Sequence, residues 1–153
     1  MPIPEFDDQT GYLPAGDHDA SLDEMEQRFC GTYRRREIFT GLKRVVEQLE
    51  ANGVRIIWIG GSFVTDKERP GDVDVIYVPP PGGDPAGWGL LSPARRKDLK
   101  KIRRVDLWKS DSPQRVPGKP LQRQTIKEFF GTDENGVAKG LIQLSREAKD
   151  DPK

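Results

Sequence analysis

Apolar side chains recur at helical spacing in two stretches of the first third of the chain. In the first, Ser21-Leu22-Asp23-Glu24 has the capping-box pattern, so we expect a short helix that ends near Phe29. In the second, a continuous apolar stripe predicts a helix over residues 35–51, closed by the C-terminal signal Asn52-Gly53. The stripe consists of Ile38, Phe39, Leu42, Val45, Val46 and Leu49.

Shorter apolar runs, rich in β-branched and aromatic residues, predict three strands. They cover residues 55–59, 73–78 and 104–108. Before the third run, Ser92-Pro93 has the form of a helix start, with serine at the N-cap and proline at the first helical position. We therefore expect a basic helix that continues to about residue 102.

The last third of the chain is less regular. Residues 125–130 and 137–144 are strand-like, and Asn135-Gly136 between them predicts a hairpin turn. Residues 109–124 contain three prolines and many polar side chains, so we expect a loop there.

Together these elements predict an α/β (α+β) fold over residues 21–145, with a small mixed β-sheet and helices mainly on one of its faces. Residues 1–20 hold prolines, glycines and scattered acids with little periodicity, so they predict an extended N-terminal arm. Residues 146–153 are polar and predict a flexible tail.

The composition supports one domain and narrows the class of protein. The chain has 153 residues, of which 34% are hydrophobic and 33% are charged. Its one cysteine, Cys30, excludes an internal disulfide, and no Cys/His cluster predicts a zinc site. No apolar run approaches the roughly 20 residues of a membrane span, and the first residues lack the pattern of a secretory signal. We therefore expect a cytoplasmic protein with no membrane partner.

Charge is unevenly spread although the formal net charge is zero. Residues 1–33 carry eight acidic side chains and one basic one, whereas residues 92–127 carry twelve basic and three acidic ones. The first segment repels nucleic acid, and the second suits the phosphates of a polyanion such as RNA. A solvated helix face is the alternative interpretation of the basic segment.

The segment that follows the first predicted strand has the chemistry of a phosphate site. Gly60-Gly61 lets the backbone turn sharply and approach a ligand closely. Ser62 then stands where a short helix begins, with a hydroxyl and free backbone N–H groups facing outward. Lys67, a few residues on, is a candidate to lean toward a triphosphate, or else is a solvated loop charge.

Two aspartates in the second predicted strand indicate a metal site. Asp72 and Asp74 are two residues apart, so they share a face of the strand and repel each other. A divalent cation removes that repulsion, and oxygen ligands suit Mg²⁺ or Mn²⁺. Asp106, in the third strand, is the candidate third carboxylate of a two-metal site. A lone surface acid at a strand edge is the alternative for Asp106.

The order Gly60-Gly61-Ser62, nine residues, then Asp72-x-Asp74 resembles the active-site signature of the polymerase-β-type nucleotidyltransferase superfamily. The resemblance implies that Gly61 and Ser62 hold nucleotide phosphates. It also implies that Asp72, Asp74 and Asp106 bind two metal ions, with Asp106 as a possible base. Over most of the chain the sequence is similar to short, mostly uncharacterised nucleotidyltransferase-like proteins of bacteria and phages. The segments that carry this likeness are residues 3–7, residues 11–14 and residues 61–67.

Three functions follow as hypotheses. The first is a metal-dependent transfer of a nucleoside monophosphate from an NTP to a hydroxyl of RNA, a protein or a small molecule. The second is a toxin–antitoxin or phage-defence component of the same fold that binds or modifies a partner protein. The third is a non-catalytic binding module. Because the chain is short for this superfamily, we expect a homo-oligomer or an obligate partner.

Overall fold

The computed structural model of the chain describes residues 3–82, 88–110, 113–116, 119–125, 130–133 and 135–145, with 113–116 and 119–125 described by their backbone alone. The α-helices are α1 (Leu22–Phe29), α2 (Tyr33–Ala51) and α3 (Arg96–Arg103), and the 3-10 helices are η1 (Ser62–Val64), η2 (Gly89–Leu91) and η3 (Pro93–Arg95). The strands are β1 (Asp17–Ala20), β2 (Ile57–Gly60), β3 (Val73–Tyr77), β4 (Val105–Lys109), β5 (Pro113–Val116), β6 (Lys119–Thr125) and β7 (Leu141–Leu144).

Helices α1 and α2 confirm the first two predicted helices, and η3 followed by α3 confirms the predicted basic helix, which ends at Arg103. Ser21 and Glu24 form the full capping box of α1, in which each side chain bonds the backbone N–H of the other residue. Helix α2 begins at Tyr33, two residues earlier than predicted, because the Thr32 hydroxyl accepts a bond from the Arg35 N–H and caps the first turn. The apolar stripe of α2 is buried, as its spacing predicts.

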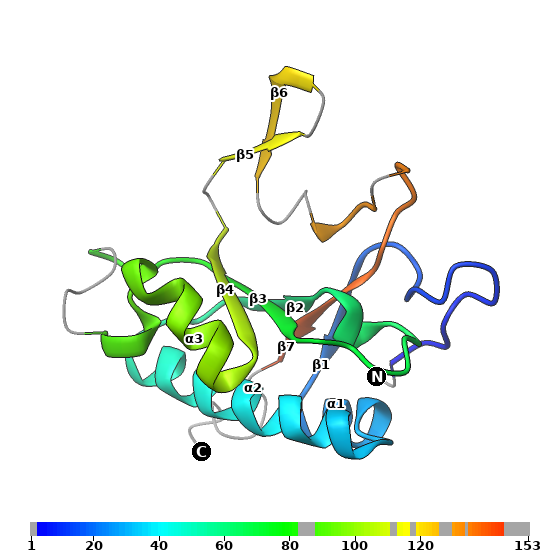
Figure 1. Cartoon of the computed structure of the whole chain (residues 1–153), viewed down its shortest axis with the longest axis horizontal. Helices are drawn as coiled ribbons and strands as arrows, with labels where there is room; N and C mark the ends of the chain where they lie inside the picture. Colours follow the sequence, from blue (N-terminus) through cyan, green and yellow to red (C-terminus); the bar gives the residue numbers. More distant parts are fainter. Residues whose placement is uncertain are drawn as a thin grey trace.

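A five-stranded mixed sheet has the strand order β1-β7-β2-β3-β4 (Figure 1). Strands β1 and β7 run parallel, as do β3 and β4, while β2 is antiparallel to both of its neighbours. The helices lie on one side of this sheet and the β5–β6 hairpin projects from the other. The structure therefore confirms the predicted fold class, a small mixed sheet with helices mainly on one face.

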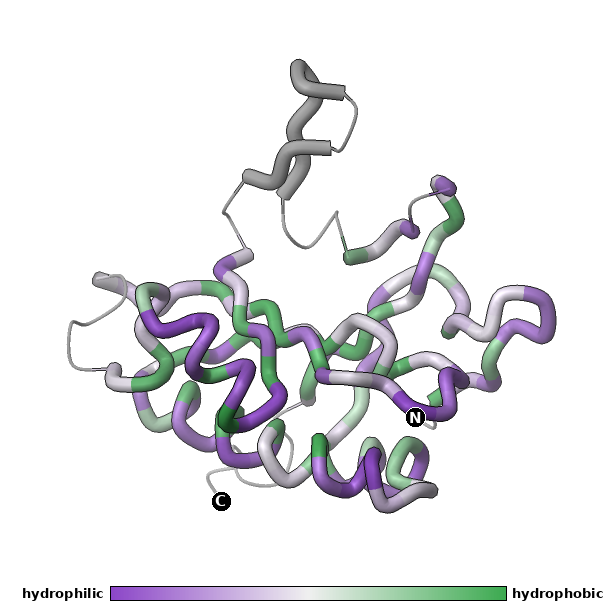
Figure 2. The backbone as a smooth tube through the Cα atoms, in the orientation of Figure 1, coloured by the Kyte–Doolittle hydropathy of each residue, from purple (hydrophilic) through white to green (hydrophobic). Residues whose placement is uncertain are grey.

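The two faces of the sheet bury different side chains. Val73, Val75 and Tyr77 of β3 belong to the main core, which contains the apolar stripe of α2. Ile76 points the opposite way and packs with Phe130, Leu141 and the two tryptophans of β2 and β4 in a second, smaller cluster. We call the side that carries Ile76 the outer face. In Figure 2 the backbone of α3 is coloured mostly hydrophilic, whereas the neighbouring strands β3 and β4 contain several hydrophobic positions.

The predicted loop over residues 109–124 is wrong. Strands β5 and β6 form an antiparallel hairpin there, separate from the main sheet. Proline is compatible with this arrangement because Pro113 and Pro120 stand at the first and second positions of their strands, close to the strand ends. Prolines in a sequence therefore did not exclude a hairpin whose strands pair only with each other.

The predicted pairing of residues 125–130 with residues 137–144 is also wrong for the described residues. Strand β7 begins at Leu141 and pairs with β1 and β2. Before it, Thr132 and Ala138 form only an isolated bridge around the turn at Gly136, whose φ is +83°. Residues 126–129, part of the first predicted strand, lie outside the described residues.

The end of the predicted N-terminal arm is a strand. Asp17–Ala20 forms β1 at the edge of the sheet, and Leu13 before it is 1% exposed. The predicted tail, residues 146–153, lies outside the described residues. No helix in the part of the chain that the structure describes is long and apolar enough to cross a membrane.

Candidate functional site

Strands β3 and β4 bring two of the predicted aspartates side by side. Asp74 is the register partner of Asp106 in this parallel pair, and neighbouring strands lie about 4.8 Å apart. Both residues point to the outer face, since their neighbours Val75 and Leu107 belong to the main core. They are 9% and 5% exposed. Asp72, just before β3, completes the group and is half-buried.

The glycine turn lies against Asp74. Gly60 of β2 is the register partner of Asp74 across the antiparallel pair. Gly61 has φ +81°, and a Cβ atom on it would overlap the Oδ2 atom of Asp74. Only glycine satisfies both the left-handed backbone and the close approach of the carboxylate. Ser62 follows as the first residue of η1, the short helix that the sequence predicts.

Arg35 of α2 holds the loop that follows Ser62. Its Nη1 donates to the carbonyl of Phe63 at 2.6 Å, and its Nη2 donates to the carbonyls of Thr65 and Lys67 at 2.7 and 2.6 Å. The Lys67 side chain forms no ion pair with a described residue, and no described contact joins it to the three aspartates. The structure thus brings Gly61, Ser62 and the aspartates together but leaves Lys67 apart from them.

Two cations of α3 bind the aspartates directly. The Nε and Nη2 atoms of Arg96 donate to the two carboxylate oxygens of Asp106 at 2.7 and 3.3 Å. The Nζ atom of Lys100 lies 3.3 Å from Oδ2 of Asp72 and 3.8 Å from Oδ2 of Asp106. Residues four apart share one face of a helix, so one face of α3 supplies both cations. This pairing was not predicted from the sequence, where the four-residue spacing of Arg96 and Lys100 was the available signal.

Trp108 is a second residue that the sequence analysis did not assign to the site. Its indole Nε1 donates to Oδ1 of Asp74 at 3.3 Å, so it fixes the orientation of that carboxylate. The guanidinium carbon of Arg96 lies 3.7 Å from the centre of the Trp108 ring. The Arg96 side chain therefore contacts both an acid and an aromatic face, which favours a planar guanidinium over a lysine.

The electrostatics of the group favour added positive charge or a bound proton. Burial, together with the negative charges of Asp72 and Asp106, raises the pKa of Asp74 from 3.8 to about 7. The hydrogen bond and the charge of Asp72 raise the pKa of Lys100. Near neutral pH, Asp74 is therefore poised between its protonated and charged forms, while Asp72 and Asp106 each face a cation.

Carboxylate oxygens are the ligands that Mg²⁺ and Mn²⁺ prefer, and the register of β3 and β4 places two of them on neighbouring strands. As the side chains stand, however, no group of three or more Asp, Glu, His or Cys residues in the described part of the chain is arranged to hold a metal ion. Arg96 and Lys100 hold two of the three carboxylates instead. The residues therefore fit a divalent cation in chemical type, provided that these two side chains release them.

The fold and the site define a class of protein: small α+β domains in which a glycine turn and three acids meet at one edge of a mixed sheet. Within it, the chain belongs to DUF6932, a family of unknown function whose model matches residues 4–145. Comparison with curated proteins and with solved structures found no match.

Proposed function

We propose that the protein is a metal-dependent nucleotidyltransferase that moves a nucleoside monophosphate from an NTP to an acceptor hydroxyl. One observation carries the proposal: Gly60, Asp74 and Asp106 occupy matching positions on three neighbouring strands. This register sets the glycine turn, suited to phosphates, against the acids, suited to metal. Asp74 does not contribute to the fold in an obvious way, because burial and the charges of Asp72 and Asp106 disfavour its ionised form.

Each residue has a proposed role. Asp72, Asp74 and Asp106 hold Mg²⁺ or Mn²⁺, which when bound offsets the charge on the α-phosphate and the leaving pyrophosphate. A carboxylate oxygen of Asp106 accepts the proton of the attacking hydroxyl. Gly61 lets the backbone approach the nucleotide, and Ser62 donates hydrogen bonds to its phosphates. Lys67 is proposed to reach the triphosphate from the loop.

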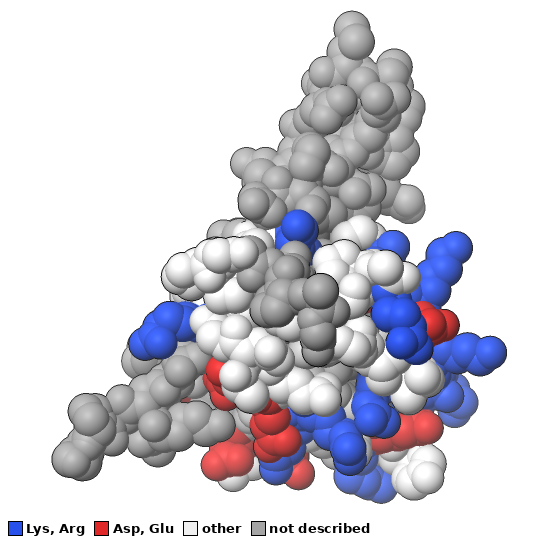
Figure 3. All heavy atoms as spheres, turned by 90° about the vertical axis from the view of Figure 1, so that its left-hand side faces the viewer, with Lys and Arg blue, Asp and Glu red and all other residues white. Residues whose placement is uncertain are grey.

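The surface around α3 supports a polyanionic acceptor such as RNA. Lys97 and Lys101 are exposed on this helix. Figure 3 shows the side of the molecule that lies at the left of Figure 1. Lys and Arg side chains gather along one flank of this view, with few acids between them. Basic side chains on a surface neutralise phosphates and release counterions. A protein or a small molecule remains an alternative acceptor.

Thermal melts with Mn²⁺, with each NTP and with both together test the proposal. We expect the melting temperature to rise most with the pair, since a ligand at a hundredfold excess over its Kd stabilises by about 2.7 kcal/mol. For a chain of this size that is about 5–10 °C. The Asp106→Asn variant should lose the shift, whereas Asp98→Asn, which changes an exposed acid of α3, should keep it. An unchanged melting temperature with every NTP at millimolar Mn²⁺ would refute a working metal site.

A non-catalytic binding module, acting on a partner protein, is the second candidate. The ion pairs of the site favour this candidate. When Asp74 is protonated, the two remaining acids, Asp72 and Asp106, face the cations Lys100 and Arg96. Such a site is already neutral without metal. In the melts above, this candidate predicts no shift with any combination of metal and nucleotide.

A further inference from the structure

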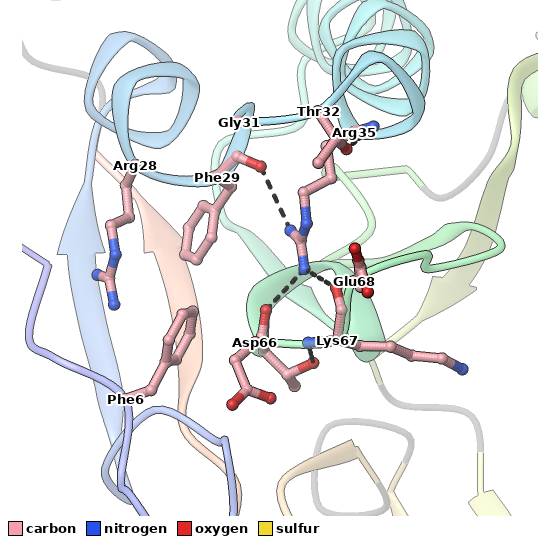
Figure 4. A pocket seen from close by; sticks show the side chains of 10 residues that line it. Phe6, Arg28, Phe29, Gly31, Thr32, Arg35, Asp66, Lys67 and Glu68 are labelled. Atoms are coloured by element: carbon pink, nitrogen blue, oxygen red, sulfur yellow. Dashed lines mark hydrogen bonds between the residues drawn. The ribbon is translucent and has the colours of Figure 1, made fainter.

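A cavity of about 470 Å³ borders the loop that follows Ser62, and none of the three aspartates lines it. It is bounded by the end of α1, the start of α2, the loop at Thr65–Glu68 and Phe6 of the N-terminal segment. Figure 4 shows Arg28 and Arg35 descending into it on either side of the Phe29 ring. Its size falls within the range of sites that bind small molecules.

Arg35 forms one wall of the cavity as a buried cation that makes no ion pair with a described residue. It is 7% exposed. Carbonyl oxygens of Phe29, Phe63, Thr65 and Lys67 accept four bonds from its two Nη atoms. A guanidinium has five N–H groups, so the Nε–H stays without a described acceptor. Its positive charge is hydrogen-bonded to neutral carbonyl groups, and Asp66 acts on it electrostatically without forming an ion pair.

Arg28 forms the opposite wall and has more donors to offer. Its Nη1 donates to the carbonyls of Ile3 and Pro4, at 3.4 and 2.9 Å. Its guanidinium carbon lies 4.3 Å from the centre of the Phe6 ring and 5.5 Å from that of Phe29. The Nε and Nη2 hydrogens have no acceptor among the described residues. The two guanidinium groups that border the cavity therefore have four N–H donors, three on Arg28 and one on Arg35, without an acceptor among the described residues.

The two acids that line the cavity do not take these donors. Neither Asp66 nor Glu68 forms an ion pair with a described residue. The Asp66 carboxylate packs instead against Gly11, where a Cβ atom would overlap its Oδ1. Phe6, which is partly exposed, supplies an aromatic surface beside the arginines, and the buried Phe29, whose ring centre is 6.2 Å away, lies behind it. The cavity therefore combines free cationic donors with an apolar wall.

We infer that this cavity is a binding site for a small anion in which a phosphate or carboxylate is joined to a planar ring. The anion pairs with Arg28 and Arg35 as a charge-assisted acceptor, and the ring packs on Phe6. Arg35 also holds the loop beside Gly61 and Ser62, so an anion bound in the cavity restricts the motion of that loop. The site does not depend on metal or catalysis at the aspartates.

Nuclear magnetic resonance titration of the ¹⁵N-labelled protein with phenyl phosphate tests the inference, with benzoate, inorganic phosphate and phenol as comparison probes. We expect phenyl phosphate to move the Nε–Hε signals of Arg28 and Arg35 and the amides of Thr65–Glu68, saturating on the order of 1 mM. Benzoate should move the same signals. Inorganic phosphate and phenol should each bind about tenfold more weakly, since each supplies half of the contacts.

Variants locate the site. Arg28→Gln should weaken phenyl phosphate binding about tenfold or more, because it removes charge-assisted bonds. Arg36→Gln, an exposed neighbour of Arg35, and Lys100→Gln at the aspartates should leave it unchanged. If Arg28→Gln does not fold, Phe6→Leu serves, and it should weaken phenyl phosphate but not inorganic phosphate. The inference is overturned if phenyl phosphate at 10 mM, about ten times that concentration, moves none of these signals. It is also overturned if Lys100→Gln abolishes binding while Arg28→Gln or Phe6→Leu spares it.

Discussion

Asp74 is the most perturbed acid among the described residues. Its carboxylate is buried against Gly61, accepts a hydrogen bond from Trp108 and lies near two other acids. The raised pKa follows from those surroundings, because burial and like charge both disfavour the ionised form. An uncharged side chain of the same shape should therefore suit the metal-free fold better than aspartate does at high pH.

We predict that Asp74→Asn stabilises the metal-free protein at pH 8 and not at pH 4. The pKa is about 7 in the folded protein and about 3.9 in the unfolded chain, so the folded state favours the protonated form. That preference contributes fully below pH 4 and is lost as the pH rises through 7. The difference, about three units, corresponds to at most about 4 kcal/mol.

Urea unfolding in EDTA at pH 4, 6 and 8 measures this effect, with Asp98→Asn as the matched exposed control. A gain for Asp74→Asn that is the same at all three pH values would show that the carboxyl does not titrate in this way.

At the scale of elements, α3 both packs against the core and contacts the aspartates. Leu99 is buried and fixes the helix against the core, while Arg96 and Lys100 contact the aspartates. The sequence predicted that the charges of this helix are solvated or bound to a polyanion. The structure shows a third partner, the acids of the same chain.

If the aspartates bind metal, removing these cations should strengthen binding. We predict that the double variant Arg96→Gln, Lys100→Gln binds Mn²⁺ more tightly, by up to about fivefold for each ion pair removed. A partly exposed ion pair contributes about 1 kcal/mol or less, and metal no longer has to displace it. Isothermal titration of Mn²⁺ into the nucleotide-free protein measures the change.

The control is Lys97→Gln, Lys101→Gln, which removes the same charge from exposed positions of α3. Equal gains in the two double variants would point to the overall charge of the helix and not to competition for the acids.

At the scale of the whole molecule, the N-terminal segment completes the fold. Strand β1 pairs with β7, so residues more than 120 positions apart in the chain lie side by side at the sheet edge. Leu13 is part of the main core, and its carbonyl accepts a bond from Gly140. The N-terminal segment is therefore part of the folded domain and not an arm that lies on its surface, because it contributes a residue to the main core.

We predict that Leu13→Ala lowers the free energy of unfolding by about 2–5 kcal/mol, the usual cost of truncating a buried leucine. Gln9→Ala, in the exposed turn of the same segment, should change it by no more than about 0.5 kcal/mol. Chemical denaturation of both variants measures the contrast. If both changes were near zero, the segment would not be part of the cooperative unit.

Local patterns in the sequence were sufficient to predict the helices α1 and α2, the strands β2, β3 and β4, and the short helix after Gly61. Each rests on residues within one or two turns or along one strand, so the signal is complete in a short window. The proximity of Gly61, Asp74 and Asp106 was also predictable, from a resemblance whose order and spacing place them together.

Only the tertiary structure decided the remaining contacts. Strand β1 contains no strong strand pattern and is held by a partner near the other end of the chain, and the β5–β6 hairpin exists through pairing of its two strands with each other. Likewise, Arg96 and Lys100 become counter-ions of Asp106 and Asp72 because α3 packs along β4. The physical reason is common to all three. A pairing free energy depends on which surfaces meet, and a local window of sequence does not contain the other surface.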